Sequence, residues 1–321
     1  MATVTFRFSV VTTVGPETQL MVVGSPEQMG HWEPDSAVHM HAFRDVISSA
    51  EPSFWQADVP VSEKALRETI YFKFLKRVNG EIIWEGRGSQ DDRHCDYDDA
   101  NVVDGVHCFP ACHWIESWGH SNEMHHTTNF YFNIADHQAI HFSRILHCLW
   151  LGSCPRQKEH VTTILRHDLA VTAIMNFQTE HDLATNSAGC APGQQVTVDT
   201  MSALCHQAEM VYIWIPTPDM STEGRIRMLP QAVFLLHGLL ECGHTVYVHC
   251  NAGVGRAAAA IAGYLRYILG WSARRCEYFL RAHRPAVYLD EEALEMASGD
   301  FAQKFGHVRR CINEKQEVRA F

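Results

Sequence analysis

The hydrophobic pattern of this chain changes its period near residue 144, so the chain must combine two kinds of architecture. Over Thr3–Val10, apolar residues alternate strictly with polar ones, which is the two-residue period of a strand with one buried face. Asn79-Gly80 separates two β-rich runs and tolerates the positive φ angles of a tight hairpin turn. No long helical period precedes about residue 140. The first part therefore predicts an all-β sandwich.

From Arg144 onward, short apolar runs bounded by turn residues alternate with helical stretches. The clearest runs, at 171–177, 210–216 and 245–249, are typical of buried parallel strands. This alternation predicts an α/β domain with a mainly parallel sheet. The predicted parts of this multidomain chain are a β-sandwich at 1–124, a linker at 125–143 and an α/β domain at 144–321.

Length and cysteine content limit the class of protein. The chain has 321 residues, of which 46% are hydrophobic, enough for two ordinary domains with real cores. No apolar run reaches the ~18 residues of a membrane span, and no basic segment followed by an apolar stretch marks a secretory signal. Eleven cysteines in a chain this long do not suggest a disulfide scaffold, so we expect reduced thiols and a cytoplasmic protein.

The negative charge is concentrated in the first part of the chain. Residues 1–124 contain 9 Lys and Arg against 19 Asp and Glu, whereas the remaining residues contain 17 against 18. An acidic domain is a poor partner for nucleic acid or anionic lipid. We therefore expect no nucleic-acid partner, and a ligand of this part that is neutral or cationic.

Residues 249–257 read HCNAGVGRA, between a predicted strand and a predicted helix. In this arrangement several backbone N–H groups point at one anion, and the helix dipole adds to the attraction. The same field favours the thiolate form of a cysteine, so Cys250 is expected to act as a nucleophile. The guanidinium of Arg256 can bind two phosphate oxygens at once. The alternative is a structural cysteine before an ordinary turn. The predicted phosphate-binding loop comprises Asn251, Ala252, Gly253, Val254, Gly255 and Arg256.

This stretch resembles the signature loop of the cysteine-dependent protein tyrosine phosphatases, HCxxGxxR followed by Ser or Thr. The resemblance implies that a thiolate attacks phosphorus and that water then hydrolyses the phosphocysteine. In the dual-specificity branch an aspartic acid on an earlier loop protonates the leaving oxygen, and Asp219 lies 31 positions before Cys250. The alternative for Asp219 is a helix or turn cap. The resemblance also implies that residues 176–183 and 284–294 contribute walls of the pocket.

One position departs from this family pattern. Ala257 stands where the pattern has a hydroxyl, which is thought to stabilise the sulfur as it leaves in the second step. We therefore expect the first chemical step to survive and hydrolysis of the phosphoenzyme to be slowed.

The stretches VVGSPEQMGHWEP and YFKFLKRVNGEIIWEGRGSQDDR resemble the starch-binding carbohydrate module of family 20. Exposed tryptophans offer rigid, apolar area on which glucose rings can stack. The resemblance implies that Trp32 and Trp84 provide this area, with Lys73 and Asp92 as hydrogen-bonding residues. Trp55 is expected to point into the core instead. A neutral polysaccharide ligand agrees with the acidic charge of this part.

The two resemblances, in this order, cover nearly the whole chain and together resemble glycogen phosphatases that join both modules. They imply a cytoplasmic enzyme at glycogen that dephosphorylates glucan, with a ubiquitin ligase and glycogen-targeting phosphatase subunits as partners. A homodimer is left open. Two alternatives remain: a dual-specificity protein phosphatase localised to glycogen, and a glycogen-bound scaffold with a slow phosphatase domain. No cofactor is expected, since the histidines and cysteines at 94–120 match no common zinc spacing.

Overall fold

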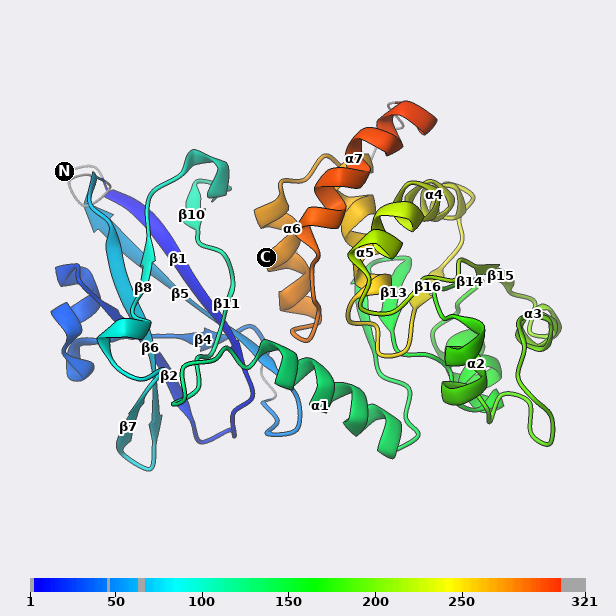
Figure 1. The fold of residues 1–321 in the computed structure, drawn as a ribbon, viewed down its shortest axis with the longest axis horizontal. Coiled ribbons are helices and arrows are strands. Elements are labelled where there is room, and N and C mark those ends of the chain that lie inside the picture. The colour runs from blue at the N-terminus through cyan, green and yellow to red at the C-terminus, as the bar shows by residue number, and fades with distance from the viewer. Residues whose placement is uncertain (1–2, 45–46, 63–66, 307–321) are drawn as a thin grey trace. The chain divides into compact units, whose positions relative to one another are not determined.

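The computed structural model describes residues 3–44, 47–62 and 67–306 (Figure 1). Within these ranges no helix is both long and apolar enough to cross a membrane. The chain forms two units, one from residues 1–130 with 277–286 and the other from 131–276 with 287–321. The predicted boundaries of the β-sandwich at residue 124 and of the α/β domain at residue 144 stay a prediction about which parts fold independently.

The first unit contains two sheets, which confirms the predicted β-sandwich. One sheet has six strands in the order β4-β5-β1-β10-β9, with β11 also paired to β1. The other has five strands in the order β3-β2-β6-β7, with β8 paired to β6. The strands are β1 (Thr3–Thr12), β2 (Gln19–Gly24), β3 (Val38–His39), β4 (His41–Ala42), β5 (Ser53–Ser62), β6 (Ile70–Val78), β7 (Glu81–Trp84), β8 (Arg93–Cys95), β9 (Val102–Val103), β10 (Val106–Cys108) and β11 (Cys112–His113). Short 3-10 helices lie in the connections: η1 (Glu27–Trp32), η2 (Pro34–Ser36), η4 (Ser89–Asp91) and η5 (Asp99–Asn101).

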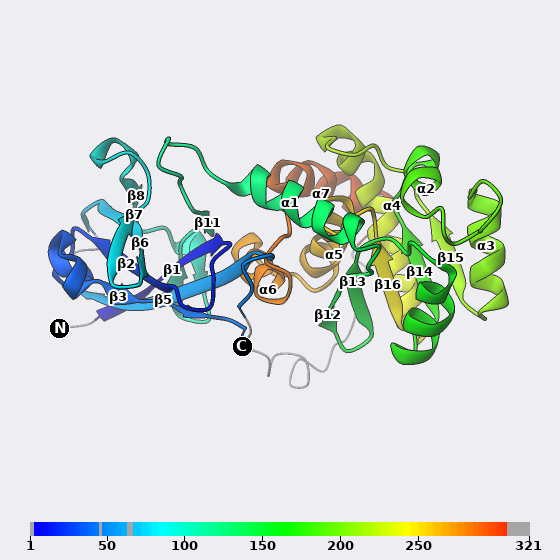
Figure 2. The same ribbon diagram turned by 90° about the horizontal axis from the view of Figure 1, so that it is seen from below.

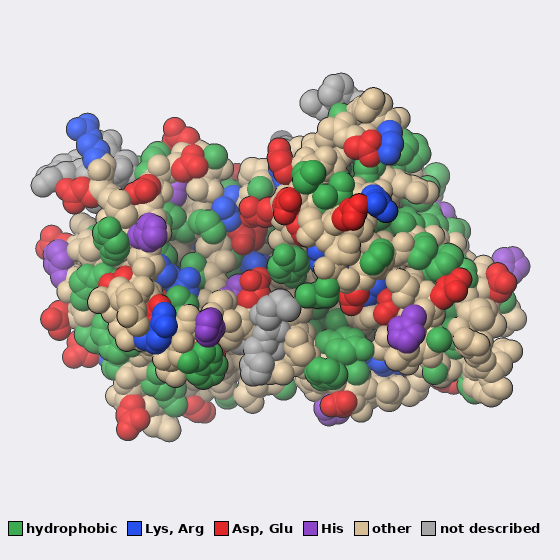
Figure 3. All heavy atoms as spheres, in the orientation of Figure 1, with side chains coloured by type: hydrophobic (Ala, Val, Ile, Leu, Met, Phe, Trp, Pro, Cys, Tyr) green, Lys and Arg blue, Asp and Glu red, His purple; other side chains and the backbone are tan. Residues whose placement is uncertain are grey.

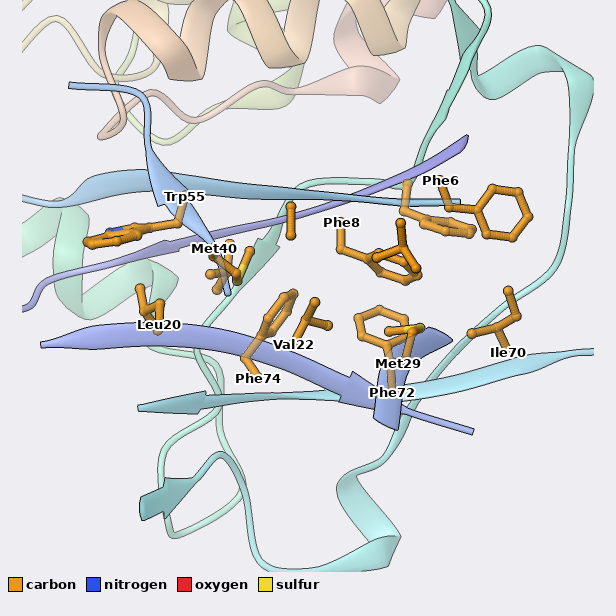
Figure 4. Packing of buried hydrophobic residues seen from close by; sticks show 14 of the residues in the cluster. Phe6, Phe8, Leu20, Val22, Met29, Met40, Trp55, Ile70, Phe72 and Phe74 are labelled. Atoms are coloured by element: carbon orange, nitrogen blue, oxygen red, sulfur yellow. The ribbon is translucent and has the colours of Figure 1, made fainter. Parts of the chain in front are cut away.

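The core of this unit lies between the two sheets, as Figure 4 shows. Phe6, Phe8 and Val10 of β1 are buried, which confirms the alternation predicted for that strand. The ring of Phe8 meets the ring of Phe72 from β6 edge-on, with centroids 4.9 Å apart. Trp55 is also buried in this core, as expected, and its indole N–H donates to Oγ of Ser53 at 2.8 Å. Such aromatic pairs add to the burial energy that holds the sheets together.

The predicted hairpin is confirmed and sets the register of the second sheet. Asn79 and Gly80 have φ angles of 51° and 85°, the left-handed values that a tight two-residue turn requires. The turn pairs Val78 with Glu81 and therefore places Trp84 directly opposite Leu75. Because side chains of directly paired residues share a face, Trp84 and Leu75 lie on the same side of the sheet.

One expectation about the boundary region was wrong. A helix, α1 (Glu123–Asp136), lies where no long helical period was expected before residue 140 and where a linker was predicted. Its sequence is rich in His, Thr, Asn and aromatic residues, which have modest helix propensity. Phe130 and Ile134, four residues apart, are buried. Burial of one narrow face therefore accounts for a helix that intrinsic preference does not predict.

The second unit contains a five-stranded sheet in the order β12-β13-β16-β14-β15, which confirms the predicted α/β architecture. The edge pair β12–β13 is antiparallel and the other pairs are parallel. The strands are β12 (Phe142–Leu146), β13 (Leu149–Gly152), β14 (Ala173–Asn176), β15 (Val211–Trp214) and β16 (Val246–His249). The α-helices after α1 are α2 (Glu180–Asn186), α3 (Val198–Gln207), α4 (Thr222–Glu241), α5 (Arg256–Gly263), α6 (Ala273–His283) and α7 (Glu291–Phe305), and residues 277–283 of α6 belong to the first unit. Two π-helical segments are η6 (His160–Asp168) and η7 (Tyr264–Ile268).

Helices cover both faces of this sheet (Figure 2). On one face, Ile174 and Tyr247 belong to a buried cluster with residues of η6, α2 and α3. On the other face, α4 and α5 contact the central strand β16. Because β16 is parallel to both neighbours, its carboxyl end opens at the edge where α/β sheets commonly bind ligands.

Candidate functional site

The stretch containing Cys250 forms the predicted connection from a strand to a helix. Strand β16 ends at His249 and helix α5 begins at Arg256, with Cys250 and Arg256 both buried. Gly253 has a φ angle of +65°, and a β-carbon there would overlap the carbonyl oxygen of Gly152. Only glycine fits this position, so the loop can curl tightly over the end of β13.

Hydrogen bonds to neighbouring residues hold the side chain of Arg256 in place. Its Nη1 donates to the carbonyl oxygen of Thr217 at 2.9 Å and to Oδ2 of Asp182 at 2.8 Å. Burial lowers the pKa of Arg256, but Cys250, Asp219 and Asp182 raise it by more, so the guanidinium stays charged. The buried Nε and Nη2 of Arg256 donate no hydrogen bond to any of the described residues. Oδ2 of Asp219 pairs with Nη2 at 3.1 Å, and an oxyanion such as phosphate could take the place of this contact and accept from Nε and Nη2 together.

Asp182 is the residue that sequence reasoning missed. It lies in the first turn of α2, where its Oδ2 accepts from the backbone N–H of Thr179 at 3.0 Å in a capping box. Its Oδ1 accepts from Nδ2 of Asn251 at 2.8 Å, so one carboxylate ties the loop to Arg256. Burial opposes its ionisation, but the hydrogen bonds from Arg256 and Asn251 outweigh burial and lower the pKa of Asp182. The signal in the sequence was the Thr-x-x-Asp capping pattern within residues 176–183.

Both segments expected to wall the pocket contact the loop. From the first segment, Nε2 of Gln178 donates to Oδ1 of Asn251 at 3.0 Å. From the second, the backbone N–H of Tyr288 donates to the carbonyl oxygen of Val254 at 2.9 Å. Asp290, which caps α7, accepts from Nη1 of Arg225 at 2.6 Å. The bonds to Asn251 and Val254 fix the loop before any ligand arrives, which is the preorganisation that anion binding needs.

Asp219 lies beside Arg256, on the loop between β15 and α4. Its Oδ2 is 3.1 Å from Nη2 of Arg256, and its side chain is 54% exposed. The alternative role as the cap of α4 is filled by Ser221, whose side chain accepts from the backbone N–H of Gly224 at 3.0 Å. The carboxylate therefore lies next to the guanidinium of Arg256 and is about half exposed, so it can reach a group bound beside that guanidinium.

His249 is completely buried behind the loop. Its Nδ1 lies 3.1 Å from the carbonyl oxygen of Cys250, and burial lowers the pKa of His249 to about 4. The ring is consequently neutral near pH 7 and supports the loop as an uncharged group.

The burial of His249 predicts a loss of stability in mild acid. Its pKa is about 4 in the folded chain and about 6.5 in the unfolded chain, so the unfolded chain takes up a proton first as the pH falls below 6.5. By pH 5.5 this difference is expected to lower the free energy of unfolding by about 1 kcal/mol. Denaturant unfolding at pH 7.5 and 5.5 should show a smaller loss for His249→Gln than for the unchanged chain. Equal losses would contradict this role of His249.

Ala257 occupies the second residue of α5 and is completely buried. The residue that precedes the helix, Gly255, makes no side-chain cap, so no hydroxyl is supplied at this helix start. Ala257→Ser is expected to raise steady-state turnover and to shrink the initial burst of alcohol release, because the phosphoenzyme would break down faster. Stopped-flow measurement with an aryl phosphate checks this, and identical turnover by both proteins would contradict it.

The four residues predicted to bind carbohydrate lie at the outer face of the sheet β3-β2-β6-β7. Leu75 forms a small cluster there with Met21 and Val23, and Trp32 packs against it. Trp84, opposite Leu75, is 39% exposed on the same face. Trp32 has a φ angle of +69°, a rare value for a bulky residue, which holds only where its surroundings impose it. The structure thus brings both rings to one face.

Lys73 and Asp92 form an ion pair beside the loop at 85–92. Nζ of Lys73 is 3.3 Å from Oδ1 of Asp92 and donates to the carbonyl oxygens of Glu85 and Gly88. Lys73 is buried, whereas Asp92 is partly exposed. The ammonium therefore fixes the loop at 85–92 that follows Trp84, and the structure does not bring it to the open surface.

The charge of the first part is visible on its surface. Acidic side chains are scattered over the visible face of the first unit (Figure 3). Among the described residues, no three His, Cys, Asp or Glu side chains are placed to hold one metal ion.

Comparison with known families agrees with both sites. The starch binding domain family matches residues 1–99, and the dual specificity phosphatase catalytic domain family matches residues 149–296. The chain is therefore a cysteine-dependent phosphatase of the dual-specificity class that carries a starch-binding domain. Laforin of Mus musculus is 53% identical over 325 residues, which cover 96% of this chain and 98% of that protein. The chain belongs to the laforin family.

Two further similarities are each confined to one part of the chain. Cyclomaltodextrin glucanotransferase of Paenibacillus macerans is 29% identical over 72 residues, which cover 22% of this chain and 9% of that protein. The crystal structure of PTPMT1 is 23% identical with a TM-score of 0.41, and the match covers 51% of this chain and 95% of that structure.

Proposed function

We propose that this phosphatase releases phosphate from phosphorylated glucan chains, glycogen among them, through a phosphocysteine intermediate. The observation that carries the proposal is the guanidinium of Arg256 at the end of the loop of Cys250, whose buried Nε and Nη2 make no hydrogen bond to a described residue, in a chain that also has a starch-binding domain. The loop holds a phosphate by its backbone N–H groups, and the guanidinium fork holds two of its oxygens.

The two chemical steps use three side chains. In the first step, Sγ of Cys250 forms a bond to phosphorus while the bond from phosphorus to the glucose oxygen breaks. Asp219 gives its proton to that oxygen, so the sugar leaves as a neutral alcohol. In the second step, Asp219 takes a proton from water as the water oxygen attacks phosphorus, and Cys250 leaves as the thiolate. Arg256 stabilises the charge on the phosphoryl oxygens in both steps.

Asp182 is proposed as a positioning residue. It reaches Arg256 and Asn251 through hydrogen bonds of 2.8 Å each, so it orients the fork and the loop together. Its negative charge also keeps the buried guanidinium paired when no phosphate is bound, which avoids the cost of an isolated buried charge.

The starch-binding domain is proposed to hold the polymer while the phosphatase domain works on its phosphates. Tethering raises the effective concentration of substrate at the second site without any new contact there. Trp84→Ala is therefore expected to lower phosphate release from glycogen by about fivefold, because one stacked ring is worth roughly 1 kcal/mol. Release from a small soluble aryl phosphate should not change. Equal losses on both substrates would contradict tethering.

The substrate class is tested by initial phosphate release from phosphorylated glycogen and from a phosphotyrosine peptide at matched phosphate concentration, with Cys250→Ser as the blank. Faster release from glycogen supports the proposal. Faster release from the peptide would favour a protein phosphatase localised to glycogen. Release at the level of the blank from both would favour a scaffold with a slow phosphatase domain.

Location and partners are part of the same proposal. Membership of the laforin family supports a cytoplasmic protein bound to glycogen, with a ubiquitin ligase and glycogen-targeting phosphatase subunits as partners and a homodimer as its assembly. Co-precipitation from the soluble fraction, before and after digestion of glycogen, separates direct partners from proteins that only share the polymer. Light scattering on the purified chain tests the dimer.

A further inference from the structure

A second exposed tryptophan lies outside the stretch that matches the starch-binding domain. Trp118 belongs to the loop between β11 and α1, beyond the matched residues 1–99. Its side chain is 61% exposed, more than any other tryptophan of the chain, with Trp84 next at 39%. Tryptophans are usually covered for most of their area, so an open ring on a fixed surface suggests contact with a ligand.

The loop that carries Trp118 is a tight, hydrogen-bonded turn. Ile115 and Ser121 pair as an antiparallel bridge, and the backbone N–H of Glu116 donates to the carbonyl oxygen of His120 at 2.9 Å. The backbone N–H of Gly119 donates to the carbonyl oxygen of Glu116 at 2.8 Å, with a φ angle of +87° at the glycine. The backbone around Trp118 is therefore ordered by its own bonds, and stacking on it would require little further ordering.

This turn is also joined to the loop at 85–92, which directly follows Trp84. The backbone N–H of Gly86 donates to the carbonyl oxygen of Ile115 at 2.9 Å, and the backbone N–H of Ile115 donates to Oε2 of Glu85 at 3.2 Å. The guanidinium of Arg87 lies so close to Gly119 that a β-carbon there would overlap it. The turn that carries Trp118 is thus bonded to the loop that directly follows Trp84.

Arg87 supplies polar groups beside this turn. Its Nε and Nη2 donate to the carboxylate of Asp91 at 3.0 and 2.9 Å, which fixes the guanidinium against Gly119. The Arg87 side chain remains about half exposed. An aromatic ring with a fixed polar group nearby suits a sugar, which presents apolar C–H faces and hydroxyl edges.

We propose that Trp118 forms an additional subsite for α-glucan. Its ring stacks on one glucose unit of a glucan whose other units are bound at Trp84. The proposal rests on the proposed function, which makes glucan the ligand of this unit, and adds a contact outside the matched domain. The occupant is a neutral glucan because the turn is bonded to the loop that follows Trp84 and lies in the acidic part of the sequence. The subsite gives the protein a higher affinity for longer glucans, since a short oligosaccharide contacts only the face around Trp84.

The test compares maltotriose with a long linear maltodextrin in calorimetric titrations of the full chain. The proteins are the unchanged chain, Trp118→Ala, Trp118→Phe, Trp84→Ala and Phe132→Ala. Phe132 is the matched control, because it is an exposed aromatic residue of the second unit. Trp118→Ala should weaken binding of the long chain by about tenfold and leave maltotriose unchanged, and Trp118→Phe should restore most of the loss. Trp84→Ala should weaken the binding of both ligands, and Phe132→Ala should weaken the binding of neither.

The outcomes separate this inference from the proposed function. Equal affinity of Trp118→Ala and the unchanged chain for both ligands would overturn the subsite while glucan binding itself stands. The subsite would also be overturned if Trp118→Ala changed the molecular mass of the protein in solution and left its affinity for glucan unaltered. That result would assign the ring to contact between copies of the chain. Failure of the unchanged chain to bind either ligand would overturn the proposed function and this subsite with it.

Discussion

Replacing Arg256 by lysine is expected to lower kcat/KM for phosphorylated glycogen by about a thousandfold, which corresponds to about 4 kcal/mol of transition-state stabilisation. Lysine keeps the positive charge beside Asp182 and Asp219, but it cannot present two N–H groups to two phosphoryl oxygens at once. The loss should therefore come from geometry and not from charge. Initial rates at low substrate concentration measure it.

A matched control for this variant is Arg166→Lys in the same unit. Arg166 pairs with Glu209 at 3.1 Å on the surface, and its replacement should change the rate by less than about twofold. Thermal unfolding of both variants shows whether each is folded at the assay temperature. Activity of Arg256→Lys within about tenfold of the unchanged chain, in a folded protein, would show that the fork is not needed.

Asp219→Asn is expected to lower kcat on phosphorylated glycogen by about a hundredfold to ten-thousandfold. The size of the loss should depend on the leaving group, because an alkoxide of glucose needs a proton to leave and a nitrophenolate does not. The loss on glycogen should therefore exceed the loss on an aryl phosphate by at least about tenfold. Rates for both substrates, measured on the same preparation, give this ratio.

Glu223→Gln is the control for Asp219→Asn. Glu223 is an exposed acidic residue a few positions later that pairs with Arg227, so it tests the removal of a nearby negative charge alone. Its rates should change by less than about twofold on either substrate. Equal losses on glycogen and aryl phosphate in Asp219→Asn would assign Asp219 to support of Arg256 and not to proton transfer.

Local patterns predicted most of the fold correctly. The alternation in Thr3–Val10 and the turn at Asn79-Gly80 depend on neighbours along the chain, and the structure confirms both. The strand-to-helix connection around Cys250 is similarly local. Helix α1 was missed because its residues have little intrinsic preference for a helix, and its stability depends on burial of Phe130 and Ile134.

The parts of the site that were not predicted depend on contacts between distant residues. Asp182 lies 74 positions before Arg256, and no sequence period links a capping residue of α2 to a loop that follows another strand. Lys73 was predicted as a hydrogen-bonding residue for carbohydrate, and no local pattern indicates that carbonyl oxygens of the loop at 85–92 accept its hydrogen bonds. Trp118 was not singled out, because a lone tryptophan in a loop looks the same in sequence whether its ring is buried or open.

The central claim, that glucan phosphate passes through Cys250, is tested most directly by rapid-quench experiments with glycogen that carries labelled phosphate. The account predicts that label appears first on the protein, at Cys250, and only later as free phosphate, with none bound in Cys250→Ser. Because Ala257 should slow the second step, the labelled protein should accumulate to a measurable level. Free phosphate that appears from glycogen without any label on Cys250 would contradict the account.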